Sequence, residues 1–222
     1  ERALRHVSHE LKTPLTALKE GVSLLREEVP GPLGEGQREV VDILQHNVRA
    51  LQEQIESLLT LNEAAFDARR LQRAPVRLKR LLAGVVQRRE LHSQARQLTV
   101  RVEAPDQSMI LDAEKMSVVL DNLLSNAIDF SPENGEVRLS VSRIDGLWRF
   151  ECIDQGPGVA EEDRQRIFDP FVQGQRVAPA PRQGSGVGLS IVRELVRAMG
   201  GRVYLVPQER GAHFCVELPD EQ

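Results

Sequence analysis

Apolar residues recur at intervals of three and four in two long segments near the start of the chain. The first repeat runs from Leu4 to Val29 and the second from Val41 to Leu58, and residues 30–36 between them are rich in proline and glycine. This spacing places the apolar side chains along one side of an α-helix, and the breaker cluster predicts a loop. A lone helical hairpin leaves such stripes uncovered. We therefore expect two copies of the hairpin to form a dimeric four-helix bundle.

The first of these helices carries a group of chemically active side chains. His9 lies roughly opposite the apolar stripe, Thr13 is four residues further on the same face, and Glu10 adjoins the histidine. Pro14 cannot donate a backbone hydrogen bond, which predicts a bend after the histidine. An unpartnered imidazole has a pKa of about 6.5 and is largely neutral and nucleophilic near neutral pH. An exposed histidine on a dimerising helix fits the same residues, and a nucleophile would need an electrophile elsewhere in the chain.

Length, charge and cysteine content limit the class of protein. The 222 residues are enough for one or two domains, and the net charge of −4 gives no polybasic surface, so we expect no nucleic-acid partner. Cys152 and Cys215 both lie in alternating apolar stretches, which predicts buried, reduced thiols and a cytosolic compartment. No apolar run approaches the ~18 residues of a membrane span. The chain begins inside a helical pattern, so we expect a fragment of a longer protein.

The periodicity changes after residue 68. We expect a dimerisation domain over residues 1–68, a linker over 69–75 and an α+β two-layer sandwich over 76–222. The predicted helices span about 78–94, 113–130, 161–167 and 187–198, and the predicted strands about 98–102, 109–111, 137–144, 147–153, 202–206 and 213–218. The dipeptide Asp145-Gly146 predicts a hairpin between two of these strands.

Three features of the second domain suit a nucleotide. Asn122 and Asn126 are four residues apart on one helix, so both amides could hold a hydrated Mg²⁺, although two ordinary polar positions would look the same. Asp154 ends a strand and is followed by glycines, so its carboxylate could accept from an exocyclic amine. The glycine-rich segment 184–189 opens a helix, whose free N–H groups suit phosphate. Each feature alone is weak.

Together and in this order, the motifs resemble those of sensor histidine kinases over essentially the whole chain. The resemblance is to a HisKA-type dimerisation and phosphoacceptor domain followed by a Bergerat-type (GHKL) ATP-binding domain. The matching segments are Ser-His-Glu-Leu-Lys-Thr-Pro-Leu at 8–15, Asp-Asn-Leu-Leu-Ser-Asn-Ala at 121–127, Asp-Gln-Gly-Pro-Gly at 154–158, Ile-Phe-Asp-Pro-Phe at 167–171 and Gly-Ser-Gly-Val-Gly at 184–188.

The resemblance implies roles for individual residues. His9 would receive the γ-phosphoryl group of ATP, and Glu10 would orient the imidazole or take its proton. Thr13 would position water against the phospho-aspartate of a partner. Asn122 and Asn126 would bind Mg²⁺. The residues implied at the nucleotide are Asn122, Asn126, Asp154, Gly156, Gly158, Phe168, Phe171, Gly184, Gly186, Val187, Gly188 and Leu189, with the two phenylalanines anchoring an ATP lid over about 159–186.

The resemblance also implies partners, a location and alternatives. The cofactors would be ATP and Mg²⁺, and the partners a second copy of the chain, a cognate response regulator and an upstream sensor with a membrane segment. The chain would be cytoplasmic and the full-length protein anchored in the bacterial inner membrane. A phosphatase-dominated sensor, a GHKL ATPase that does not phosphorylate itself, and a non-enzymatic dimerisation scaffold remain as alternatives.

One residue departs from the family pattern. Asp129 occupies a place where a basic residue near the phosphates is common. We expect this acid to repel ATP unless it turns away, and Arg176 or Arg182 to substitute for the missing cation.

Overall fold

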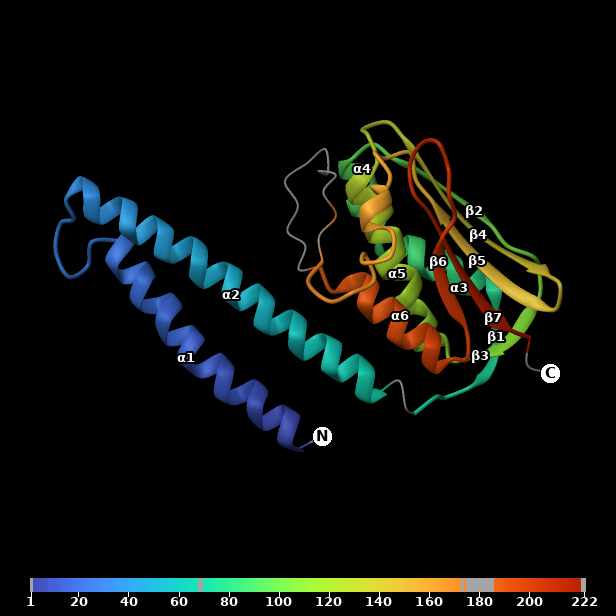
Figure 1. Cartoon of the computed structure of the whole chain (residues 1–222), viewed down its shortest axis with the longest axis horizontal. Coiled ribbons are helices and arrows are strands. Elements are labelled where there is room, and N and C mark those ends of the chain that lie inside the picture. Colours follow the sequence, from blue (N-terminus) through green and yellow to red (C-terminus); the bar gives the residue numbers. More distant parts are fainter. Residues whose placement is uncertain (1, 68–69, 173, 175–185, 221–222) are drawn as a thin grey trace. The chain divides into compact units, whose positions relative to one another are not determined.

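The computed structural model describes residues 2–67, 70–172, 174 and 186–220 (Figure 1), with only the backbone described for residues 2–12, 53, 57, 58 and 60–67. The chain divides into two compact units, Glu1–Glu63 and Ala64–Gln222. Each unit is described by itself below.

The first unit is a helical hairpin. Helix α1 spans Arg2–Arg26, with Pro14 inside it, and helix α2 begins at Glu35 and spans Glu35–Asp67. Four buried side chains from the two helices form its core, and Leu33 and Ile55 pack against them; the four are Leu15, Val22, Val41 and Val48. Part of the apolar stripe stays uncovered among the side chains that the structure describes. Leu18, Leu25, Leu44 and Leu51 are all exposed.

The second unit is built on a five-stranded mixed sheet with the strand order β2-β4-β5-β7-β6. The strands are β2 (Thr99–Glu103), β4 (Glu136–Ile144), β5 (Leu147–Ile153), β6 (Arg202–Leu205) and β7 (His213–Pro219). Strand β2 pairs with β4 in parallel and the other pairs are antiparallel. The β4–β5 turn has positive φ at both Asp145 and Gly146, as a two-residue hairpin turn requires. The predicted hairpin is confirmed.

Three helices lie on one face of this sheet (Figure 1): α3 (Leu78–Arg88), α5 (Ala113–Phe130) and α6 (Gly188–Ala198). Alternate strand residues such as Leu139, Phe150 and Val216 are fully buried beneath them. Helix α5 occupies the predicted limits. The Asp112 side chain accepts from the Lys115 N–H at 3.0 Å and caps its first turn. The predicted helical hairpin followed by a two-layer α+β sandwich is confirmed.

Three local predictions differ from the structure. The helix expected over residues 78–94 is interrupted at Arg89, whose guanidinium binds Asp121, and continues as the short helix α4 (Glu90–Ala95). Ala74 and Pro75, expected in the linker, belong to strand β1 (Ala74–Arg77), which pairs with β3 (Ser108–Leu111) in a separate two-stranded sheet. The helix expected over 161–167 is a single 3₁₀ turn, η1 (Glu161–Asp163), followed by turns.

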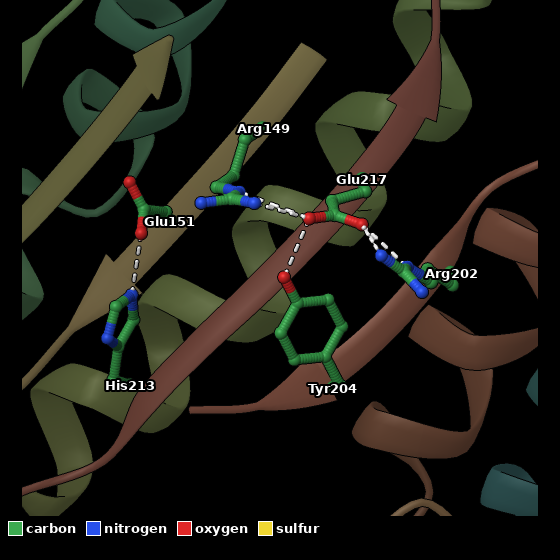
Figure 2. Close-up of polar contacts among 6 residues, drawn as sticks. All are labelled: Arg149, Glu151, Arg202, Tyr204, His213 and Glu217. Carbon is green, nitrogen blue, oxygen red and sulfur yellow. Dashed lines mark hydrogen bonds and ion pairs between the residues drawn. The ribbon is translucent and has the colours of Figure 1, made fainter. Parts of the chain in front are cut away.

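The opposite face of the large sheet is polar. Glu217 on β7 is only 2% exposed although it is an acid, because three neighbouring side chains cover it (Figure 2). Arg149 on β5 donates to one carboxylate oxygen at 2.8 Å and Tyr204 on β6 donates to the same oxygen at 2.7 Å. Arg202 on β6 donates to the other oxygen at 2.5 Å. This network joins three adjacent strands through one carboxylate.

Candidate nucleotide-binding site

The second unit contains a cavity of about 710 Å³, including the open solvent at its mouth. Its walls come from α5, the segment after β5, the residues around η1, the start of α6 and the start of β7. The lining residues are Asn126, Phe130, Asp154, Gly158, Val159, Ala160, Asp163, Ile167, Val172, Gly174, Gly186, Gly188, Leu189, Ala212 and Phe214. Most of the side chains are apolar, and the few polar ones are concentrated on α5, after β5 and at η1. This composition is typical of a small-molecule site.

Asp154 is the carboxylate that directly follows β5, and it is only 4% exposed. Its Oδ1 atom accepts two backbone hydrogen bonds, from Gly156 N at 2.8 Å and from Ala212 N at 2.9 Å. Burial raises the pKa of this carboxyl group, and the two hydrogen bonds oppose the rise. No residue in the described part of the chain donates to Oδ2. This second oxygen can therefore accept from a ligand.

The two glycines after Asp154 occupy positions where a side chain would not fit or would be disfavoured. A Cβ atom at Gly156 would lie 2.6 Å from the Phe130 carbonyl oxygen, so only glycine fits there. Gly158 has a φ of +73°, which side chains disfavour, and it lines the cavity, whereas Gly156 does not. These residues bring the backbone close to any flat ring bound beside Asp154.

The two asparagines predicted to share a metal have different surroundings. Asn126 lines the cavity. The Nδ2 atom of Asn122 donates to the Val118 carbonyl at 2.8 Å within the same helix, and its Oδ1 atom lies against Gly188, where a Cβ would be only 2.7 Å away. In the described part of the chain, no three His, Cys, Asp or Glu side chains come together as a metal site. Any cation here would take amide oxygens together with oxygens of its ligand.

The start of α6 forms another wall of the cavity. Gly186, with a φ of +72°, Gly188 and Leu189 line it, whereas Val187 is buried and accepts from the Ser190 hydroxyl at 2.7 Å. The first N–H groups of an α-helix have no partner within the helix and carry partial positive charge. This end of the cavity therefore suits an anion. Gly184, also predicted at the ligand, lies outside the described residues.

The two predicted lid anchors lie beside the cavity rather than in its wall. Phe168 is buried and its ring meets that of Phe214 edge-on, with the centroids 6.2 Å apart. Phe171 has a φ of +63°, is half exposed, and donates its N–H to the Gly186 carbonyl at 3.0 Å. The hydrogen bond from Phe171 to Gly186 joins the residues that follow η1 to the residues that precede α6.

Asp129, expected to repel a nucleotide unless it turned away, pairs with α4. Its Oδ1 lies 3.1 Å from Nε2 of His92, and it does not line the cavity. The predicted substitutes Arg176 and Arg182 lie outside the described residues.

The remaining predicted site residues are in the first unit. His9 and Glu10 lie in α1, where only their backbone is described, and Thr13 lies in the same helix with its side chain exposed. The structure therefore gathers Asn126, Asp154, Gly158, Gly186, Gly188 and Leu189 around one cavity. It leaves the histidine group in a separate unit.

Sequence reasoning missed several residues of the cavity wall. Phe130, Asp163, Ala212 and Phe214 line it, and Ala212 also holds Asp154. Phe130 lies three residues after the 121–127 motif, and Asp163 lies inside the lid predicted over about 159–186, although neither was singled out as a site residue. Ala212 and Phe214 follow a glycine at the start of a strand, where nothing in the local sequence indicates a ligand.

Comparison with known proteins identifies the two units. The family model for the histidine kinase-, DNA gyrase B-, and HSP90-like ATPase matches residues 111–222, which include the cavity. The chain belongs to this ATPase family. The model for the His Kinase A (phospho-acceptor) domain matches residues 1–65, which include the Ser8–Leu15 segment. The combination makes this chain the core of a two-component sensor histidine kinase, as the order of motifs predicted.

Curated relatives match this chain across both regions. The sensor histidine kinase GlrK of Escherichia coli (strain K12) is 38% identical over 221 residues, which cover 99% of this chain and 46% of the relative. The alginate biosynthesis sensor protein KinB of Pseudomonas aeruginosa is 31% identical, over 96% of this chain and 36% of the relative. The chain thus spans less than half the length of these relatives.

Solved structures agree with the fold. Full-length ShkA in complex with AMPPNP superposes with a TM-score of 0.71 at 32% identity, over 98% of this chain and 45% of that one. The Acinetobacter baumannii histidine kinase AdeS superposes with a TM-score of 0.67 at 23% identity, over 96% of this chain and 98% of that one, which supports the fold alone. None of the described helices of this chain combines the length and apolar character of a membrane crossing.

Proposed function

We propose that this chain binds ATP in the cavity, phosphorylates His9 and passes the phosphoryl group to an aspartate of a response regulator. The observation that carries the proposal is Asp154, a nearly buried carboxylate with one oxygen held by two backbone donors and the other without a described donor. An acceptor in an otherwise apolar wall suits the 6-amino group of adenine. The AMPPNP bound to the related kinase ShkA supports the same ligand class.

The triphosphate would extend from Asp154 towards the start of α6. Gly186 and Gly188 bring the backbone to the cavity wall there, and the N-terminal N–H groups of the helix suit phosphate oxygens. Asn126 and Asn122 are the residues whose amide oxygens would hold Mg²⁺. When bound, Mg²⁺ neutralises charge on the phosphates and so favours phosphoryl transfer.

His9 is the proposed nucleophile. A nitrogen of its neutral imidazole attacks the γ-phosphorus, the bond between this phosphorus and ADP breaks, and Glu10 takes the imidazole proton. Transfer to a response regulator then forms a phospho-aspartate and restores the free histidine. Thr13, one helical turn beyond His9 on α1, is proposed to position water for hydrolysis of that phospho-aspartate.

A second copy of the chain is the proposed partner of the helical hairpin. Leu18 and Leu51 are 53% and 43% exposed, although their apolar repeat is continuous with the buried core. Pairing two hairpins would cover both stripes. An upstream sensor and a membrane anchor in the full-length protein are also proposed.

Incubation with γ-labelled ATP and Mg²⁺ tests the kinase assignment. We expect acid-labile, base-stable label on the wild type and none on His9→Gln. The matched control is His46→Gln, which removes an exposed histidine from α2 and should leave the label unchanged. Label at the wild-type level in His9→Gln would refute the assignment. Release of free phosphate without any protein label would instead favour an ATPase that does not phosphorylate itself.

The role of Thr13 needs a separate assay. In Thr13→Ala we expect normal labelling of His9 and slower loss of phosphate from a phosphorylated response regulator. Thr16→Ala, which changes an exposed threonine in the next turn of α1, is the control. An unchanged dephosphorylation rate in Thr13→Ala would contradict the assignment.

A further inference from the structure

The start of β7 contacts Asp154 from the far end of the sequence. Ala212 uses both of its backbone groups on this one residue: its N–H donates to Asp154 Oδ1 at 2.9 Å, and its carbonyl accepts from Asp154 N at 3.0 Å. Ala212 is itself buried and lines the cavity. The carboxylate is therefore held at its main chain and at its side chain by a residue 58 positions away.

Gly211 makes this close approach possible. A Cβ atom at Gly211 would lie 1.9 Å from the Asp154 carbonyl oxygen and 2.8 Å from its carbonyl carbon. The residue also has a φ of +78°, which side chains disfavour. Any other residue would push the start of β7 away from Asp154.

The turn is attached to a well-anchored strand. His213, the next residue, pairs with Ile153 in the register between β5 and β7, and its ring lies 2.8 Å from Glu151 (Figure 2). Further along β7, Glu217 is bound by Arg149, Arg202 and Tyr204. The Ala212 N–H is therefore fixed by the sheet rather than by a free loop.

We infer that the turn Gly211–Ala212 is the positioning element that holds the Asp154 carboxylate in place with its second oxygen towards the ligand, and so sets how strongly the site discriminates between 6-amino and 6-oxo purines. Two N–H donors point at the Oδ1 position, so that position must carry an acceptor, and only the Oδ2 position remains for the base. A carboxylate held in this way accepts from a 6-amino group and repels a 6-oxo group. The inference rests on the proposed binding of ATP.

Asp154→Asn tests which atom is held. The Asn carbonyl oxygen must take the Oδ1 position, because a side-chain NH₂ group there would face two donors. The NH₂ group then points at the base, where it donates to a 6-oxo group and opposes a 6-amino group. Titrating the full chain with ATP and with ITP, we expect the wild type to prefer ATP by about tenfold or more and Asp154→Asn to prefer ITP. Loss of ATP binding without tighter ITP binding would overturn the inference.

Gly211→Ala tests the turn itself. We expect ATP affinity to fall about tenfold while ITP affinity changes little, so that the ratio of the two dissociation constants collapses. Gly146→Ala is the matched control, because Gly146 has a φ of +76° and nothing within 4 Å of an added Cβ. This control should keep the wild-type ratio.

The possible results distinguish an error in the positioning role from a variant that does not fold and from an error in the proposed function. Affinities for ATP and ITP that fall in proportion, or that do not change, would overturn the role of the turn. If Gly211→Ala does not fold, the nucleotide preference of Asp154→Asn decides alone. A wild type that binds neither nucleotide would refute the proposed function instead.

Discussion

The carboxylate of Glu217 is expected to stabilise the second unit substantially, although it lies on the sheet face that carries no part of the cavity. It is 2% exposed and accepts hydrogen bonds from Arg149, Arg202 and Tyr204 (Figure 2). Burial alone would raise its pKa, but the hydrogen bonds from Tyr204, Arg202 and Arg149 lower the pKa from 4.5 to about 2. The perturbation is Glu217→Gln, which keeps the shape and removes the charge.

The magnitude follows from this pKa shift. At about 1.4 kcal/mol for each pKa unit, the ionised carboxylate contributes about 3 kcal/mol. The covering side chains are themselves reached by solvent, since Arg149 and Arg202 are 32% and 71% exposed. Screening reduces the contribution, so we expect Glu217→Gln to lower the free energy of unfolding by about 2 kcal/mol at pH 7.

The dependence on pH provides a second test. Because the folded-state pKa is lowered, the stabilisation is fully present above pH 4.5 and is lost as the pH falls towards 2. A protonated glutamate resembles glutamine. The difference between wild type and Glu217→Gln should therefore shrink to less than about 1 kcal/mol at pH 3.

A single tryptophan makes the assay specific to this unit. Trp148 on β5 is buried, and its Nε1 donates to Asp220 at 2.8 Å, so its fluorescence reports unfolding of the sheet during a urea titration. Glu103→Gln is the control, since the side chain of this acid is 65% exposed and its ion pair with Arg138 is long, at 4.0 Å. We expect the control to change the free energy of unfolding by less than about 0.5 kcal/mol. A change that small in Glu217→Gln would refute the reasoning. So would a difference that stays constant down to pH 3.

Three further outcomes follow from single contacts. Asp112→Ala should lower the free energy of unfolding by about 2 kcal/mol in the same fluorescence assay, because the buried carboxylate caps α5; a loss below about 0.5 kcal/mol would contradict this. Gly188→Ala should change the free energy of unfolding by less than about 1 kcal/mol, since alanine favours a helix. It should weaken ATP binding in titration calorimetry, because the added Cβ displaces the Asn122 amide. Equal ATP affinity would show that the amide is not needed. Asp129→Asn should change the dissociation constant for ATP by less than about twofold, because this acid pairs with His92 away from the cavity. A several-fold tightening would mean that its charge reaches the phosphates.

Local signals account for the parts of the fold that the sequence predicted correctly. Helix α5 begins after the capping residue Asp112 and ends before Ser131-Pro132, and both ends can be recognised without tertiary information. The Asp145-Gly146 turn likewise supplies the positive φ values that its hairpin needs. Strand β1 was missed because Ala74–Arg77 contains a proline and exists only through pairing with β3.

At the cavity, the sequence pattern predicts which residues share a side of a helix, but packing determines where their side chains point. Helical spacing correctly places Asn122 and Asn126 on one side of α5, but it does not give the direction of each amide. One amide turns back to the Val118 carbonyl, whereas the other residue lines the cavity. Asp129 is likewise directed by His92 of another helix, so its charge could not be assigned to the site from position alone.

At Asp154, packing determines both the direction of the side chain and the ligand group that it can accept from. Its position after a strand and before glycines indicated an acceptor, yet a carboxylate that is free to rotate would hold no acceptor at a fixed place beside the ligand. The structure restricts it through Ala212, which adjoins Gly211, a residue that no motif singled out. Gly211 is needed because the Asp154 carbonyl lies where its side chain would be, and this contact exists only after β5 and β7 have paired. If Asp154 has its proposed role, the specificity of the site depends on the register of the sheet as well as on the motif.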